Sequence, residues 1–204
     1  MSEISLQTPL RREDVRSLKI GDVVFLTGDF IGTAGYPTHL RLIECVERGE
    51  EPPVDMRSAA FFHLGSMFRE ASGRIEAVYV NPTTSTRFNA FMPRLVRHFG
   101  LNALAGKGGL DDACVKAMQE VGCVYFSMIG GTAPLLTEGI REVVETGWND
   151  LIMQFRLTRF RTEGFGPLTV AIDAHGNSQY EDLTRSALDR LPSIMQDLNE
   201  SRSR

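Results

Sequence analysis

The 204-residue sequence is poor in cysteine and has no long hydrophobic run. Its three cysteines, Cys45, Cys114 and Cys123, stand at unrelated spacings, which fits a reducing cytoplasm better than a disulfide framework. A membrane-spanning helix needs about 18 or more consecutive apolar residues, and no such stretch occurs. The first residues also lack the basic start and apolar run of a secretory signal. We therefore predict a cytoplasmic protein with no membrane partner.

An excess of positive charge is missing as well. Lysine and arginine total 22 against 26 aspartates and glutamates, which gives a formal net charge of −4. Proteins that bind nucleic acid usually carry a basic face, so this composition argues against a nucleic-acid partner. Small molecules and other proteins are the expected ligands.

Metal-ligand spacings are absent from the sequence too. The four histidines form no His-x-x-x-His pair, and Cys114 and Cys123 form no Cys-x-x-Cys pair. A lone histidine near an apolar segment, such as His39 or His63, is more often a hydrogen-bonded structural residue than a base or a ligand. We predict no metal site on this chain alone.

What the sequence does contain is an alternation of apolar runs, glycine-rich loops and helical patterns. The patterns predict strands at 21–28, 59–64, 75–80, 102–105, 123–129, 142–144, 152–157 and 167–172. They predict helices at 37–48, 89–99, 111–120, 133–140 and 181–198, the last one kinked or restarted at Pro192. Asp111-Asp112 should cap the helix that follows them.

This organisation predicts one α/β domain over residues 1–204, with 42% hydrophobic residues to fill its core. Residues 1–17 would form an N-terminal arm or a short docking strand, and 199–204 a frayed tail. Strand–loop–helix alternation in the middle third favours a mainly parallel central sheet with flanking helices. The outer strands lack intervening helices, which indicates a second, partly antiparallel sheet.

Three loops at predicted strand ends have a composition suited to an anion, and ligands of such sheets gather at the carboxyl ends of the strands. Residues 81–87 place hydroxyls and the planar fork of Arg87 beside a helix start. Gly106-Lys107-Gly108-Gly109 lets a ligand approach the backbone closely, and Gly130-Gly131-Thr132 is the third loop. The plain alternatives are a capped helix, an ordinary turn and tight packing.

Several motifs occur together in a fixed order between Val15 and Tyr180. They are Gly21-Asp22-Val23-Val24-Phe25-Leu26-Thr27-Gly28, Thr33-Ala34 with His39, Phe62-His63-x-Gly65, Pro82-Thr83-Thr84-Ser85-x-Arg87, Gly106-Lys107-Gly108-Gly109, Gly130-Gly131 with Ala133, and Phe165-Gly166-Pro167-Leu168-x-Val170-x-Ile172-Asp173-x-His175-Gly176-Asn177. This set resembles the β subunit of the class I fumarase and L(+)-tartrate dehydratase family of iron–sulfur hydro-lyases. The last motif is closer to the tartrate dehydratase branch.

The resemblance implies a swivelling β/β/α-type fold and a reversible dehydration of a small 2-hydroxy (di)carboxylic acid, such as L(+)-tartrate or malate. It implies a hetero-oligomer in which a partner α subunit holds the 4Fe–4S cluster, while this chain in isolation could form a homodimer. By motif match, the catalytic residues are Thr83, as a base, and Lys107. The implied substrate-binding residues are Arg87, Thr84, Ser85, Gly108, Gly131 and His39.

The resemblance fails at two neighbouring positions before His39. The family usually carries an arginine that grips a substrate carboxylate where this chain has Gly35, and an aspartate where it has Tyr36. Losing a buried charge-assisted contact costs about 1.5–3 kcal/mol. Three hypotheses therefore stay open: a catalytic β subunit, a non-catalytic carboxylate-binding or regulatory subunit with the same fold, and a structural assembly partner.

Overall fold

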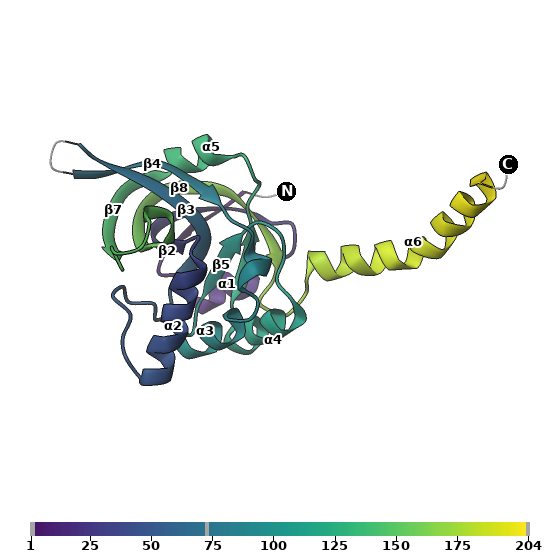
Figure 1. Cartoon of the computed structure of the whole chain (residues 1–204), viewed down its shortest axis with the longest axis horizontal. Helices are drawn as coiled ribbons and strands as arrows, with labels where there is room; N and C mark the ends of the chain where they lie inside the picture. Colours follow the sequence, from purple (N-terminus) through teal and green to yellow (C-terminus); the bar gives the residue numbers. More distant parts are fainter. Residues whose placement is uncertain (1–2, 72–73, 203–204) are drawn as a thin grey trace.

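The computed structural model describes residues 3–71 and 74–202, so the outer ends of the predicted arm and tail lie outside the described residues (Figure 1). In chain order the elements are β1 (Glu3–Gln7), α1 (Arg12–Ser17), β2 (Val23–Thr33), α2 (Tyr36–Arg48), β3 (Ala60–Ala71), β4 (Arg74–Pro82), the 3-10 turn η1 (Ser85–Phe88), α3 (Met92–Phe99), β5 (Ala103–Gly106), α4 (Asp112–Val121), β6 (Val124–Ser127), α5 (Ala133–Glu138), β7 (Ile140–Gly147), the 3-10 turn η2 (Met153–Phe155), β8 (Leu157–Ile172) and α6 (Gln179–Arg202). Within the described ranges, no helix is both long enough and apolar enough to cross a membrane.

Five strands close into a barrel in the order β2, β3, β5, β6 and β8, because β8 also pairs with β2. Strands β2, β3, β5 and β6 run parallel to one another. Strand β8 runs antiparallel to both β2 and β6. Outside the barrel, β1 pairs with β2, β4 with β3, and β7 with β8.

The α/β class is confirmed, but the prediction of a mainly parallel central sheet needs correction. The barrel is mixed, because the 16-residue strand β8 returns between β6 and β2 in the opposite direction. Sequence analysis predicted only the end of this strand, 167–172, as a strand in its own right, because Gly164 and Pro167 are typical of loops and interrupt the apolar pattern. The strand passes them through register shifts in its pairing with β2, which let the barrel wall continue.

The other elements follow the predictions with local differences. The N-terminal arm contains a docking strand, β1, and the Asp111 side chain caps α4 by accepting a hydrogen bond from the Cys114 N–H at 3.0 Å. The strand predicted at 152–157 is wrong, because Phe155 N–H donates to the Ile152 carbonyl at 2.8 Å and closes η2. Helix α6 does not restart at Pro192 but continues through it and bends along its length (Figure 1).

Two apolar clusters lie on the two faces of the barrel wall. Phe62 belongs to the interior cluster, where its ring stacks on Phe30 with centroids 4.6 Å apart. Its neighbour Phe61 points the other way, into the cluster shared with α2, α3 and α4. Because successive side chains of a strand alternate between faces, the paired aromatic residues of β3 anchor both clusters at once.

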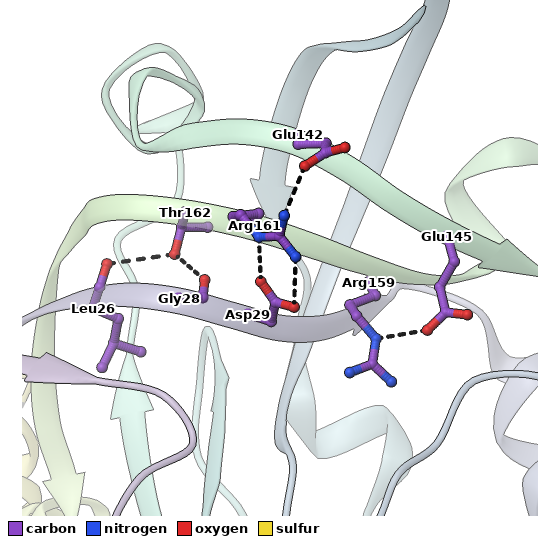
Figure 2. Close-up of polar contacts among 8 residues, drawn as sticks. All are labelled: Leu26, Gly28, Asp29, Glu142, Glu145, Arg159, Arg161 and Thr162. Atoms are coloured by element: carbon purple, nitrogen blue, oxygen red, sulfur yellow. Dashed lines mark hydrogen bonds and ion pairs between the residues drawn. The ribbon is translucent and has the colours of Figure 1, made fainter.

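The closure between β2 and β8 carries polar contacts of two kinds (Figure 2). On the surface, Arg161 bridges Asp29 and Glu142, both at 3.1 Å. Beneath them, the buried Thr162 hydroxyl donates to the Gly28 carbonyl at 2.8 Å. Exposed ion pairs contribute little, so the buried hydroxyl contributes more to the closure.

Replacing Thr162 by valine should lower the free energy of unfolding by about 1–2 kcal/mol, because the Gly28 carbonyl loses this buried donor. Thr158 on the same strand is the matched control, since its buried hydroxyl has no hydrogen-bond partner among the described residues. Thr158→Val should leave the stability unchanged or raise it. Urea unfolding of both variants tests this, and an equal loss in the two would contradict the assigned role of Thr162.

Candidate active site

Three loops meet at the ends of β4, β5 and β6. Lys107 N–H donates to the Thr83 carbonyl at 3.0 Å, and Ser85 N–H donates to the Lys107 carbonyl at 2.9 Å, which joins the first two loops. The Lys107 ammonium lies 3.9 Å from the place a Cβ would take at Gly130, in the third loop. The structure thus brings together the three segments that the sequence analysis selected.

Thr83 and Arg87 lie on the same side of the first loop. Residues 85–88 form η1, and this single turn brings the Arg87 guanidinium back over Thr83. Arg87 Nη2 donates to Thr83 Oγ1 at 3.1 Å. A positive charge at this distance favours negative charge on the oxygen, so the arrangement eases ionisation of the hydroxyl.

Lys107 presents a positive charge at the same place, the rim that residues 81–87, 106–109 and 130–132 form where the three loops meet. Its side chain is half-buried, and the ammonium has no hydrogen-bond or ion-pair partner in the described part of the chain. Gly108 adopts a left-handed conformation with φ of 72°, and Gly108, Gly130 and Gly131 are all exposed. An unpaired ammonium and a guanidinium beside open glycine backbone can bind an anion.

A buried hydrogen-bond network lies directly beneath the rim. Ser85 Oγ is within 2.9 Å of both His63 Nδ1 and the Tyr125 hydroxyl, and that hydroxyl donates to the Gly108 carbonyl at 2.8 Å. Ser85 and Tyr125 are fully buried, and burial raises the pKa of the Tyr125 hydroxyl. Ser85, predicted to bind substrate, therefore joins the loops from below, while its predicted role stays untested.

Sequence reasoning missed the parts that His63 and Tyr125 play in this network. His63 was interpreted as structural, which its position confirms, but no pattern showed that it meets Ser85. Tyr125 lies within an apolar strand, and its hydroxyl was the single feature of the sequence that could have indicated a polar contact there. A buried polar atom needs a partner, so this hydroxyl pointed to a polar neighbour without identifying it.

His39 lies behind the rim and does not reach the open surface. Its ring is fully buried and stacks on Phe88 with centroids 3.9 Å apart. Nδ1 contacts the Gly35 carbonyl at 2.7 Å, and Nε2 has no partner among the described residues. Burial lowers the pKa of His39 to about 4, so the ring is neutral at pH 7.

Gly35, at the start of α2, has no room for a side chain. A Cβ built there would lie 2.8 Å from Phe155 Cβ and 3.0 Å from Phe155 Cα. The Phe155 carbonyl also accepts hydrogen bonds from the Thr33 and Thr38 hydroxyls, which hold η2 against the end of β2. Packing against η2 thus occupies the space that a larger residue at position 35 would need.

The cysteines of this chain do not fit an iron–sulfur cluster. Cys114 and Cys123 are buried, and burial raises the pKa of both thiols, which disfavours the thiolate form that binds iron. Within residues 3–71 and 74–202, no group of three or more histidine, cysteine, aspartate or glutamate side chains could hold a metal ion.

Comparisons with known proteins show which family this chain belongs to. The family described as "Fumarase C-terminus" matches residues 1–183. The putative L(+)-tartrate dehydratase subunit beta of Methanocaldococcus jannaschii is 33% identical over 187 residues, 91% of this chain and 95% of that protein. The L(+)-tartrate dehydratase subunit beta of Escherichia coli K12 is 32% identical over 196 residues, 96% of this chain and 95% of that protein. A putative class I fumarate hydratase of Geobacillus stearothermophilus is 32% identical over 189 residues, which are 92% of this chain but 35% of that protein.

Gly35→Ala should destabilise the fold by about 1–3 kcal/mol, because the added methyl group overlaps the buried Thr38 hydroxyl and Phe155. Gly65→Ala is the control from the same region, since a Cβ there lies in ordinary contact, 3.4 Å from Ala34 Cβ. Thermal unfolding of both variants measures the difference. A Gly35→Ala protein as stable as Gly65→Ala would show that Phe155 moves freely out of this space.

Tyr125→Phe should lower the stability by about 1–3 kcal/mol and loosen residues 106–109, because Ser85 and the Gly108 carbonyl both lose a buried partner. Tyr36→Phe is the matched control, since Tyr36 is exposed and its hydroxyl has no hydrogen-bond partner among the described residues. Hydrogen exchange of the 106–109 amides should quicken in the first variant alone. Equal exchange in both would remove Tyr125 from the support of this loop.

Proposed function

Because this chain belongs to the fumarase C-terminus family, we propose that it is the β subunit of a hydro-lyase. The reaction is the reversible dehydration of a small 2-hydroxy (di)carboxylic acid such as L(+)-tartrate or malate. The observation that carries the proposal is the meeting of Thr83, Arg87 and Lys107 at one open rim. A cluster-bearing α subunit completes the active site in a cytoplasmic hetero-oligomer.

Two features of the relatives support a second component. The relatives from M. jannaschii and E. coli carry the words "subunit beta" in their names. The putative class I fumarate hydratase matches this chain over 35% of its own length, so it carries a long further segment. The cysteines of this chain do not fit a 4Fe–4S cluster, which assigns the cluster to the α subunit in this proposal.

The residues of this chain supply charge and a proton acceptor for the dehydration. The substrate loses a proton from the carbon next to a carboxylate and expels a hydroxyl group. Lys107 and Arg87 bind carboxylates and stabilise the negative charge that builds up on them. Thr83 Oγ1 first gives its own proton to solvent water and then accepts the substrate's proton, while the hydroxide that leaves takes up a proton from solvent and departs as water. The Arg87 hydrogen bond favours the ionised form of Thr83.

The remaining predicted residues surround these three groups. Thr84 pairs with Lys107 across the joined loops, and Gly108 lies against the Thr84 methyl group. Gly131, exposed and left-handed with φ of 87°, leaves the rim open beside Lys107. His39 is set back behind Phe88, so it supports the rim by packing and by its contact with the Gly35 carbonyl.

The filled space at Gly35 favours a second candidate, a non-catalytic carboxylate-binding or regulatory subunit. Such a subunit keeps the anion site while lacking the arginine that the family usually carries there. Thermal shifts of the isolated chain with dicarboxylates test binding, and turnover after reconstitution with the α subunit separates the two candidates.

In the reconstituted enzyme, Thr83→Ala should reduce kcat by about 100-fold or more, because the proton acceptor is lost. Thr83→Ser should retain most of the activity, since it keeps the hydroxyl. Lys107→Ala should mainly raise KM, because a carboxylate loses its cation. The assay follows fumarate or oxaloacetate formed from malate or L(+)-tartrate.

The controls are Thr184→Ala and Lys116→Ala, which change exposed residues of the same types outside the three loops of the site. Both should keep the activity of the unaltered enzyme. Full activity in Thr83→Ala and Lys107→Ala would refute the catalytic assignment. Binding of dicarboxylates without turnover in the intact complex would establish the second candidate.

A further inference from the structure

Helix α6 is the one part of the described chain that packs along almost none of its length. Every residue from 181 to 202 is exposed, and the helix projects away from the barrel (Figure 1). It nevertheless carries six large apolar side chains that are 44–61% exposed: Leu183, Leu188, Leu191, Ile194, Met195 and Leu198. Soluble proteins rarely expose a continuous apolar surface of this kind unless another molecule covers it.

Five of these side chains, all except Leu183, form a stripe along one face of α6. At about 100° per residue, residues 184, 187, 188, 191, 194, 195 and 198 all lie within about 60° of a line through Leu191. None of these seven residues is charged. Asp182, Asp189 and Glu200 lie on the opposite face. The helix is therefore amphipathic: one face is an uncharged, mainly apolar stripe, and the opposite face carries acidic side chains.

We propose that this stripe pairs with the same stripe of a second copy of the chain, in an antiparallel arrangement with the two-fold axis at Leu191. The stripe is self-complementary about that residue. Leu191 meets its own copy, Leu188 meets Ile194, and the small residues Ala187 and Thr184 meet Met195 and Leu198. Large apolar side chains thus meet one another at the centre of the seam, and large side chains face small ones on either side of it, which allows the two helices to pack closely.

A hollow at the root of α6 provides room for this partner. It is lined by Leu110, Asp112, Tyr180, Thr184, Arg185 and Leu188, among other residues. In the antiparallel pair, Leu198 of the second copy lies opposite Thr184 and fills this hollow. The root itself is fixed to the barrel, because the Tyr180 hydroxyl donates to Ser127 Oγ and the ring packs against Gly109.

The shape of the molecule selects the antiparallel direction. The barrel lies at the N-terminal end of α6 only (Figure 1). A helix of 24 residues is about 36 Å long, so antiparallel pairing places the two barrels at opposite ends. A parallel pair would force both barrels to the same end. Pro192 lies about 100° from the centre of the stripe, so its ring stays on the flank of the seam.

Light scattering after size exclusion tests the pairing in the full chain. The unaltered protein should have twice the 22.7 kDa mass of one chain. Leu191→Asp should give the single-chain mass, because it opposes two carboxylates in an apolar seam. Ser186→Asp, on the charged face, is the matched control and should stay dimeric. A single-chain mass for the unaltered protein, or a dimer that survives Leu191→Asp, would overturn the proposal.

Cysteine pairs test the direction. A mixture of Ala187→Cys and Met195→Cys chains should form a disulfide-linked dimer under mild oxidation, whereas Ala187→Cys alone should not. The unaltered chain is the control for its native thiols, of which Cys114 and Cys123 are buried. Cross-linking of Ala187→Cys alone would instead show parallel pairing. If the backbone amides of the stripe are protected from hydrogen exchange only when the α subunit is added, the stripe binds that subunit, and the proposed self-pairing is refuted.

Discussion

The pairing of β8 with β2 is the constraint on which the rest of the structure depends. Without it, β2, β3, β5 and β6 would form an open parallel sheet with two free edges. With it, the sheet becomes a closed barrel whose interior is filled by Phe30, Phe62 and Phe165. Closure also fixes the tilt of the parallel strands, and so places the loops after β5 and β6 at one rim.

At that rim, two layers of polar groups have different roles: one holds the loops in place and the other carries positive charge. The buried layer of His63, Ser85 and Tyr125 holds the loops in place, and its hydrogen bonds are strong because no water competes for them. The upper layer, made of the exposed Arg87 and the half-buried Lys107, carries the positive charge. The lower layer is neutral because burial lowers the pKa of His63 and raises that of Tyr125, so it adds no charge that would repel or neutralise an anion.

Local sequence patterns predicted the rim better than the barrel. Glycines and hydroxyls at strand ends are local signals, so the loops of Thr83, Lys107 and Gly131 could be selected from composition and spacing. Barrel closure is not local, because it depends on the pairing of β8 with β2, which lie more than a hundred residues apart in the sequence. Gly164 also makes the middle of β8 resemble a loop. The contact of Tyr125 with Ser85 was hidden for the same reason, since periodicity predicts burial but not the neighbour.

The packing around Gly35 leaves no room for a side chain at this position. Phe155 fills the space beside it, and the Phe155 carbonyl holds the hydroxyls of Thr33 and Thr38 at the end of β2. Restoring a long side chain at position 35 would require η2 to move and these hydrogen bonds to break. The strand that ends there is β2, whose pairing with β8 closes the barrel. In the proposed function, Arg87 and Lys107 are the positive groups of this chain that bind the anion.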